Sequence, residues 1–337
     1  MIRRHLGGTP AIRAAGIVAG AVADRLIKDP QRHHPVAVFG SFAQRLEQRL
    51  YAPTKRRGAV FWAAAVLPPT TAAWAADRAL ARSGAARAGL LALSLWAALG
   101  GTMLERTGKA MAKDLAAGEQ SKDLSAARGW VPWLCSRDPE LLDAAGMARA
   151  TVESLAENTS DATIAPLVWA ALGGTPAVVA HRCINTLDAM VGYRSERYNN
   201  FGWASAKIDD LAAWLPARVT ALTHTAVAGL WHGRAGISGA VRAWRTDAPR
   251  HPSPNAGPVE ATAAAALGVT LGGRTEYSYG VEMRPTMGQG PAPVCADIGR
   301  AVDLARASEF IVVAAALAGL WLRGRLGAGP RGARRGG

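Results

Sequence analysis

The apolar positions of this chain are grouped into charge-free runs that are separated by short basic clusters. Residues 58–76, "GAVFWAAAVLPPTTAAWAA", carry no charge and lie between Arg57 and Asp77. Residues 88–104 and 162–180 are further runs without a charge. A helix needs about 20 mostly apolar residues to cross a bilayer. Each of the three runs is therefore predicted to be a membrane helix.

Weaker runs are interrupted by charge or are short, namely residues 10–27, 211–231 and 307–322. Arg13 and Asp24 interrupt the first of these runs, and Arg218 interrupts the second. A charged side chain at the centre of a membrane helix costs about 2.5–3.5 kcal/mol on insertion scales. We therefore expect the weaker runs to have protein neighbours or interfacial positions.

These runs predict an all-α, multi-pass integral membrane protein whose polar helical loops form an active site on the cytoplasmic side. One membrane-embedded catalytic domain is expected over residues 1–322, and a disordered Gly/Arg tail over 323–337. No regular alternation of apolar and polar residues predicts a sheet. A soluble, alanine-rich bundle with buried helices is the alternative, and it is compatible with the mean hydropathy of +0.06.

The net charge narrows the class of partner. The chain has 337 residues, of which 50% are hydrophobic, and a formal net charge of +14. Such a charge favours nucleic acid, a phosphate-bearing substrate or an anionic membrane surface. The basic residues lie in clusters between apolar runs, as in Lys55-Arg56-Arg57, which is the positive-inside pattern of membrane proteins. We therefore expect a membrane surface, and not nucleic acid, as the anionic partner of this chain.

The same rule gives an orientation. The polar stretch 105–160 contains seven Lys and Arg residues, and by the positive-inside rule we expect it on the cytoplasmic side of the inner membrane. Arg78, Arg82 and Arg87 count against this orientation, because their turn would then face outward. Arg3-Arg4 before "AAGIVAGAVA" is similar to a secretory signal, but we interpret the segment as a first membrane-associated helix.

Oxygen-bearing side chains gather at the start of the run 162–180. They are Glu153, Glu157, Asn158, Thr159 and Asp161. Residues four apart share one face of a helix, so the three acids line up if the segment is helical. The pattern is typical of a surface ladder of ion pairs. It also fits a Mg²⁺ site, because Mg²⁺ prefers oxygen ligands and usually binds together with substrate phosphates.

A second cluster follows the same run, within residues 181–218. Asn185 and Asp188 are three apart and again share a helix face. Asp209-Asp210 is either a pair that complements a helix N-terminus or a further source of metal ligands. Cationic and aromatic residues of this segment that could hold an anion are Arg182, Arg194, Arg197, Tyr198 and Lys207.

The two acidic clusters could meet only if the run between them is broken. Pro166, Gly173-Gly174 and Pro176 are helix breakers within it. We therefore expect a broken or re-entrant segment that returns to the same side of the membrane, a conformation that is tolerated where protein buries it.

A third cluster is the turn "SPNAGP", which precedes a predicted helix. Ser253, Asn255 and Gly257 lie in this turn, and Pro258 opens the helix. Free backbone N–H groups at a helix N-terminus can bind a phosphate or carboxylate. An ordinary helix cap is the alternative. The sequence contains no P-loop motif, so a nucleotide would be held in another way.

A resemblance to a known family rests on five segments: "DPQRHHPVAVFG", "ESLAENTSDATIAPLVWAALGG", "INTLDAMVGYR", "FGWASAKIDDLAAWLPAR" and "SPNAG". Together they closely resemble the adenosylcobinamide-phosphate synthase family (CobD/CbiB) of cobalamin biosynthesis, from about Asp24 to Gly273. The departures are small. Ser160 and Ala162 stand where the family is expected to have Val and Gly, and Pro139 stands where Thr is expected.

The resemblance implies a multi-pass membrane ligase. Such an enzyme joins adenosylcobyric acid to (R)-1-amino-2-propanol O-phosphate, or to ethanolamine phosphate, and consumes ATP with Mg²⁺. The expected partners are these substrates and the lipid bilayer, with no nucleic acid, and association with other membrane enzymes of the pathway is an open alternative.

On that basis we assign roles to the clustered residues. The expected catalytic residues are Glu153, Glu157, Asp161, Asp188, Asp209 and Asp210. The expected Mg²⁺ ligands are Glu153, Glu157, Asp161 and Asp188. The expected substrate- and phosphate-binding residues are Asn158, Arg182, Asn185, Arg194, Tyr198, Lys207, Ser253, Asn255 and Gly257. Asp209 or Asp210 is the candidate base for the ammonium nucleophile.

Two other functions remain open. A membrane phosphotransferase or prenyltransferase also surrounds Mg²⁺ with acids at helical spacing, but it would accept a diphosphate lipid and need no corrinoid. A transporter would use intramembrane charges as a permeation path and form no covalent product.

Overall fold

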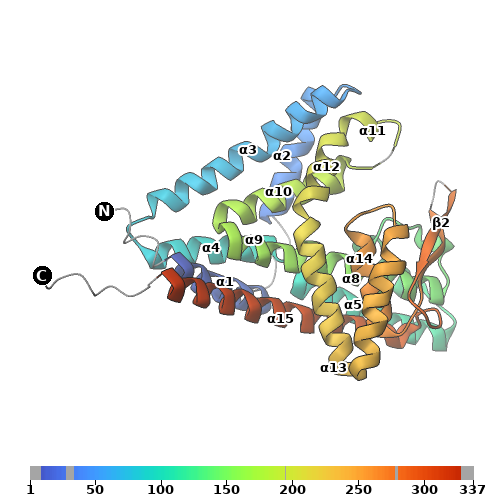
Figure 1. Ribbon diagram of the computed structural model, residues 1–337. Helices are drawn as coiled ribbons and strands as arrows, with labels where there is room; N and C mark the ends of the chain where they lie inside the picture. The colour runs from blue at the N-terminus through green and yellow to red at the C-terminus, as the bar shows by residue number, and fades with distance from the viewer. Residues whose placement is uncertain (1–8, 28–33, 194, 278–279, 328–337) are drawn as a thin grey trace, which may run out of the picture. The chain divides into compact units, whose positions relative to one another are not determined.

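The described part of the chain is mostly helical and contains a β-hairpin (Figure 1). The computed structural model describes residues 9–27, 34–193, 195–277 and 280–327. The pattern of contacts divides the chain into two compact units. Unit 1 comprises Met1–Leu99, Pro166–Asp209 and Val312–Gly337, and unit 2 comprises Gly100–Ala165 and Asp210–Ile311. Each unit is described by itself.

Unit 1 consists of helices. They are α1 (Thr9–Leu26), α2 (Pro35–Leu50), α3 (Lys55–Ala79), α4 (Gly84–Ala98), most of α9 (Ala165–Gly173), α10 (Thr175–Val191), α11 (Tyr198–Phe201), most of α12 (Trp203–Ala212) and the end of α15 (Cys295–Gly327). Thr54 and Ser83 begin α3 and α4, because their hydroxyl oxygens accept the N–H groups of Arg57 and Ala86.

Small residues permit close helix packing in unit 1. Helix α1 packs against α4 (Figure 1). A Cβ atom on Gly20 would lie 2.6 Å from the Cβ of Leu95, so only glycine allows this approach. Gly58 of α3 likewise lies against the backbone of Phe201, whose ring packs on that of Phe61 with centroids 5.0 Å apart. These contacts connect α3 to α11.

Unit 2 combines helices with the hairpin. Its elements are α5 (Gly101–Ser121), α6 (Ser125–Arg128), α7 (Val131–Leu134), η2 (Pro139–Leu141), α8 (Ala144–Thr159), the π-helix η3 (Ser160–Ile164), α13 (Trp214–Thr246), η4 (Ala248–Arg250), α14 (Ala256–Leu267), β1 (Leu271–Tyr277), β2 (Gly280–Met287) and the start of α15.

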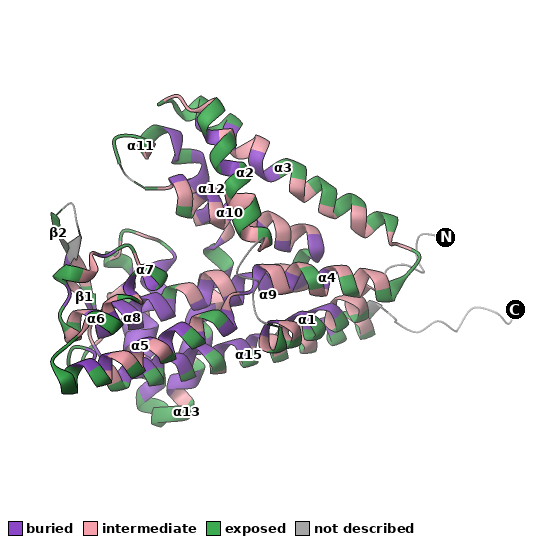
Figure 2. Cartoon of the chain, turned by 180° about the vertical axis from the view of Figure 1, so that it is seen from behind, coloured by how far each residue is buried: buried purple, intermediate pink, exposed green. Residues whose placement is uncertain are grey.

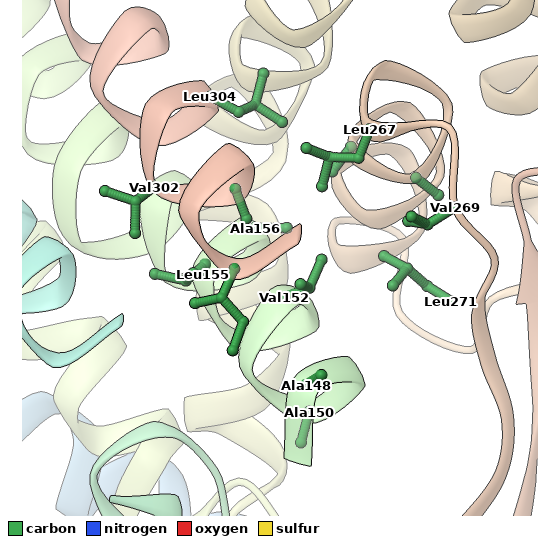
Figure 3. Close-up of a cluster of buried hydrophobic side chains, with 14 of the residues drawn as sticks. Ala148, Ala150, Val152, Leu155, Ala156, Leu267, Val269, Leu271, Val302 and Leu304 are labelled. Atoms are coloured by element: carbon green, nitrogen blue, oxygen red, sulfur yellow. The ribbon is translucent and has the colours of Figure 1, made fainter. Parts of the chain in front are cut away.

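The core of unit 2 lies between α8, α14 and the start of α15. Leu155, Leu267 and Val302 are each at most 1% exposed and belong to one apolar cluster (Figure 3). Helices α8 and α14 bury most of their residues, and Figure 2 shows the buried residues along α8. A helix buried on most sides holds its polar side chains in fixed positions, and this applies to the acids of α8.

Helix α13 is interrupted at Gly233, which has φ 63° and ψ −148°. Only glycine adopts this backbone conformation readily. The two parts of the helix then pack against each other, since a Cβ atom on Gly236 would lie 2.1 Å from the carbonyl oxygen of Ala228.

The sequence analysis did not predict this hairpin. Strands β1 and β2 pair antiparallel, with an irregular register between Leu271 and Gly273. Gly272 and Gly273 have φ of 79° and 80°. An irregularity at two glycines breaks the period-two alternation by which a strand is recognised. Leu271 and Met287 are fully buried and fix the hairpin to the core.

The predicted apolar runs are helical, but two of them are broken. The run 10–27 corresponds to α1, and 58–76 lies inside α3. The run 88–104 breaks at Leu99 and Gly100, where the Gly100 N–H donates to the Ala162 carbonyl at 2.9 Å. The run 162–180 breaks at Gly174, which has φ 70°, so the predicted breaker acts as expected.

Two stretches of the described residues, 55–79 and 84–121, are long and apolar enough to cross a membrane by length and composition. The run 211–231 contributes to α12 and α13, and 307–322 lies within α15. Helix α15 continues to Gly327 and thus includes Arg323 and Arg325, which we expected in the tail. Residues 328–337 of that tail lie outside the described residues.

Candidate functional site

The Glu153 carboxylate is the centre of a buried polar cluster in unit 2. Its Oε1 accepts the Gly272 N–H at 2.7 Å. Its Oε2 accepts Nη2–H of Arg137 and, at 3.3 Å, Nη1–H of Arg284. Helix α8, strand β1, strand β2 and the loop before η2 therefore meet at one carboxylate. Such pairing offsets the cost of burying the charge.

Arg284 also binds a second buried acid. Its Nη2–H donates to Oε1 of Glu260 at 3.0 Å and to Nε2 of His251 at 2.8 Å. A guanidinium can only donate, so Nε2 of His251 must accept. We therefore place the ring proton on Nδ1, which lies 3.3 Å from the Ser253 carbonyl oxygen. Burial, followed by the charge of Arg284, lowers the pKa of His251 and keeps the ring neutral.

Glu260 retains one oxygen without a partner. Its side chain is fully buried, and Oε2 has no hydrogen-bond partner within the described part of the chain. Burial raises the pKa of this carboxyl from 4.5 to about 8; Arg284 opposes the rise, and the charges of Glu153 and Glu157 add to it. The carboxyl therefore holds a proton at neutral pH.

Glu157 lies one turn after Glu153 on the same helix and differs from it. Its side chain is exposed to solvent, and it makes no hydrogen bond or ion pair with any residue that the structure describes. The pKa of its carboxyl is raised above the ordinary value, mainly because the surrounding protein desolvates it. The charge of Arg284 opposes this rise, the charge of Glu153 adds to it, and the charge of Arg137 opposes it. Glu157 is thus an exposed residue whose carboxyl is nevertheless partly desolvated by the surrounding protein.

These groups form one carboxylate–guanidinium cluster, which we define as Arg137, Glu153, Glu157, Glu260 and Arg284. The sequence analysis selected only Glu153 and Glu157 as site residues. Arg284 lies in the unpredicted hairpin, and Glu260 has the spacing of an ordinary first-turn acid. A long-range ion pair leaves no local pattern that would have identified them.

The residues after Glu157 form the π-helix η3, which includes Asp161. Single π-helical turns inside α-helices are frequent at functional sites. Asp161 is partly exposed. The amide of Asn158 is directed back along α8, where Nδ2–H donates to the carbonyl oxygen and the hydroxyl of Ser154, each at 3.0 Å.

The cluster does not fit a complete Mg²⁺ site. Within the described ranges, no group of three or more His, Cys, Asp and Glu side chains could hold a metal ion. Glu153 is already engaged by Arg137, Arg284 and the Gly272 amide. An octahedral ion needs closely placed oxygen ligands with unused lone pairs, and Glu153 does not provide them.

The turn before α14 is a capped and braced helix start. Oγ of Ser253 accepts the N–H groups of Asn255 at 3.3 Å and of Ala256 at 3.1 Å. Oδ1 of Asn255 accepts from Arg218 at 2.8 Å, and its Nδ2–H donates to the Asp210 carbonyl at 2.8 Å. The Asn255 side chain thus connects α14 to α13 and the end of α12.

Gly257 permits a close approach within this turn. A Cβ atom there would lie 2.5 Å from the carbonyl oxygen of Ala248. The glycine is therefore required by packing of α14 against η4, whether or not the turn also binds an anion.

Unit 1 contains the second group of predicted residues. On α10, Nη1–H of Arg182 donates to Oδ1 of Asn185 at 3.3 Å. Asp188 follows on the same helix, with its carboxylate against Gly192. Arg182 also lines a cavity of about 360 Å³, whose walls come from α2, α3, α4 and α10.

The remaining predicted residues of unit 1 are separate from that group. The Tyr198 hydroxyl donates to Oε1 of Glu47 at 3.0 Å, and Arg197 donates to the same oxygen at 2.9 Å. On α12, Lys207 is exposed and Asp209 is buried. Arg194 lies outside the described residues. The expected metal ligands are thus divided: Asp188 belongs to unit 1, and the other three belong to unit 2.

Comparison with known proteins gives one consistent family. The family model described as CobD/Cbib protein matches residues 17–305. A cobalamin biosynthesis protein CobD of Mycobacterium tuberculosis is 48% identical over 294 residues, which cover 87% of this chain and 91% of that protein. The Chromobacterium violaceum protein of the same name is 43% identical over 312 residues, 90% of this chain and 95% of that protein. No solved structure matches the chain.

Proposed function

The chain belongs to the CobD/CbiB family, and from this premise we propose that it acts in cobalamin biosynthesis as an adenosylcobinamide-phosphate synthase. The reaction would join adenosylcobyric acid to (R)-1-amino-2-propanol O-phosphate, or to ethanolamine phosphate, through an amide. The observation that carries this proposal is the family match over residues 17–305, which includes all the clustered polar residues.

Amide formation requires activation of the acid, because a carboxylate oxygen is a poor leaving group. ATP would transfer a phosphoryl or adenylyl group to a carboxylate oxygen of the corrinoid. The amine nitrogen then forms a bond to the carbonyl carbon, and phosphate or AMP leaves with the electron pair of the broken C–O bond. The nitrogen releases a proton to a base, for which Asp209 and Asp210 of α12 are candidates.

The residues of the chain would bind and orient the reactants. Arg182 and Lys207 supply cationic groups for a substrate phosphate, with Asn185 and Asp188 on the same helix as Arg182. In unit 2, the carboxylate–guanidinium cluster holds α8, α14 and the hairpin together, so that Glu157 has a fixed position. Rigid placement of this kind lowers the entropic cost of bringing reactants together.

Magnesium would accompany ATP and neutralise its phosphates. Because the described residues do not form a complete Mg²⁺ site, we assign the ion to the nucleotide complex and derive no step from it.

A membrane location is part of the proposal. Val60, Leu67 and Trp74 of α3 are 47%, 50% and 54% exposed. Large apolar side chains exposed along a helix long enough to span a bilayer fit contact with lipid. The seven Lys and Arg residues of the stretch 105–160, which are the residues that the positive-inside rule counts, support a multi-pass protein of the inner membrane with its active site toward the cytoplasm.

The direct test uses the protein purified in detergent. It is incubated with adenosylcobyric acid, aminopropanol phosphate, Mg²⁺ and ATP, and the corrinoid is analysed by mass spectrometry. We expect a product whose mass shows a new amide. The variant Asp188→Asn should lose turnover. The variant Glu140→Gln, which changes an exposed residue, should keep near-normal turnover.

Absence of the amide under all these conditions would contradict the proposal. A product formed from a diphosphate lipid without a corrinoid would instead identify a phosphotransferase or prenyltransferase. Accumulation of an unmodified solute in vesicles, with no covalent product, would identify a transporter.

A further inference from the structure

The carboxylate–guanidinium cluster has one carboxylate more than its guanidinium groups can pair. Glu153, Glu157 and Glu260 face Arg137 and Arg284, which leaves one excess negative charge when all are ionised. Arg284 is shared, with Nη1 directed to Glu153 and Nη2 directed to Glu260. The shortage of positive charge therefore falls on Glu157 and Glu260.

Two sets of oxygen atoms in the cluster lack a partner. Oε2 of the fully buried Glu260 makes no hydrogen bond within the described part of the chain. Because it is bonded to the same carbon as Oε1, which binds Arg284, this oxygen lies inside the cluster. The Glu157 carboxylate also has no hydrogen-bond or ion-pair partner among the described residues, and its side chain is exposed. Buried carboxylate oxygens without partners are costly, and a bound ligand commonly explains them.

The missing partner is better matched by a monovalent ammonium group than by Mg²⁺. When Glu260 releases its proton, the cluster has one excess negative charge, which one monovalent cation balances. The neighbouring guanidinium groups repel a divalent ion twice as strongly as a monovalent one. Mg²⁺ also requires near-octahedral ligands at about 2.0–2.1 Å. The described residues offer no group of three acids, histidines or cysteines for it. A primary ammonium carries three N–H donors and needs only carboxylate acceptors.

We propose that Glu157, together with the buried Glu260 of the same cluster, forms a binding site for a primary ammonium group, and that the amine end of the amino-alcohol phosphate binds there. The substrate part of this proposal rests on the proposed function. Glu157 is the residue that contacts the ammonium, because it is the exposed acid of the cluster, whereas Glu153 and Glu260 are buried. Glu260 is a positioning residue that holds Arg284 in place, and its carboxyl carries a proton that a bound cation would replace.

Steady-state kinetics with the detergent-purified full chain tests this assignment. In Glu157→Gln we expect the KM for aminopropanol phosphate to rise about 10- to 100-fold, the loss typical of one charge-assisted hydrogen bond. The KM values for ATP with Mg²⁺ and for adenosylcobyric acid should stay within about twofold. Glu260→Gln should raise the same single KM by a smaller factor, whereas Glu140→Gln should change none of them.

Calorimetry gives a second readout that needs no turnover. Wild-type protein should bind aminopropanol phosphate more tightly than its deamino analogue, propanediol phosphate, and Glu157→Gln should bind both equally. If Glu260→Gln does not fold, as judged by thermal unfolding, Glu157→Gln alone decides the question.

The outcomes separate the two proposals. A wild-type protein that forms no amide contradicts the proposed function, while the calorimetric preference for the amine still reports on the ammonium site. A selective rise in the KM for ATP with Mg²⁺ in Glu157→Gln would overturn the inference in favour of a metal ligand. Equal binding of amine and deamino analogue by wild-type protein would overturn it as well.

Discussion

Arg284 of strand β2 and Glu260 of helix α14 are joined by a hydrogen bond of 3.0 Å between Nη2 and Oε1. The other terminal nitrogen of the same guanidinium lies 3.3 Å from Oε2 of Glu153. One guanidinium group thus binds two buried carboxyl groups on two different helices. The stability of unit 2 should depend on it more than on any surface pair.

Replacement of Arg284 by Met should destabilise the protein by about 3–5 kcal/mol, because it leaves Glu153 and Glu260 buried with less compensation. Arg300→Met is the matched control. Arg300 pairs with Asp297 at 3.0 Å but is 44% exposed, so its loss should cost about 0–1 kcal/mol. Thermal unfolding of both variants in detergent measures the difference, and equal losses would refute the compensating role of Arg284.

The raised pKa of Glu260 predicts a pH dependence of stability. Its carboxyl has a pKa of about 8 in the folded protein and an ordinary value of 4.5. Between these values the folded state holds a proton that the unfolded state has released, so the free energy of unfolding falls as pH rises from about 4.5 to 8. Above pH 8 both states are ionised and this contribution becomes constant.

Glu260→Gln should remove that slope. The measurement is the difference in unfolding temperature between wild type and Glu260→Gln across pH 5 to 9, which cancels the contributions of other groups. A difference that does not change with pH would show that Glu260 is already ionised in the folded protein.

Gly257→Ala should destabilise unit 2 by about 1–3 kcal/mol, because the new Cβ would lie 2.5 Å from the Ala248 carbonyl oxygen and must displace backbone. Gly299 of α15 provides the control, since a Cβ there would meet nothing within 4 Å. Gly299→Ala should stabilise the helix by up to about 1 kcal/mol. Denaturant unfolding compares the two variants, and a neutral Gly257→Ala would mean that η4 moves easily.

Tyr198→Phe should affect stability and leave substrate binding unchanged. The Tyr198 hydroxyl donates to Glu47 at 3.0 Å, and loss of such a bond costs about 1 kcal/mol. Tyr193 is 55% exposed, so Tyr193→Phe should be neutral. The KM of Tyr198→Phe for aminopropanol phosphate decides whether Tyr198 has a structural or a substrate-binding role. A tenfold rise in this KM would support the substrate-binding role expected from the sequence.

The sequence by itself determined the helical class, the family and one face of the site. Apolar runs such as 58–76 predict helices because a helix with an apolar surface has a local signature. The family was recognisable because its motifs are long and continuous. The four-residue spacing of Glu153 and Glu157 placed both acids on one face of α8, since helical geometry depends only on neighbours in the chain.

Only the tertiary structure decided which contacts those acids make. Gly272 and Arg284 reach Glu153 across 119 and 131 residues, from a hairpin whose glycines disrupt the period-two pattern. These contacts pair Glu153 with two arginines and a backbone amide, whereas the side chain of Glu157 is exposed. The balance of charge in a buried cluster is a sum over distant residues, and no local periodicity records that sum.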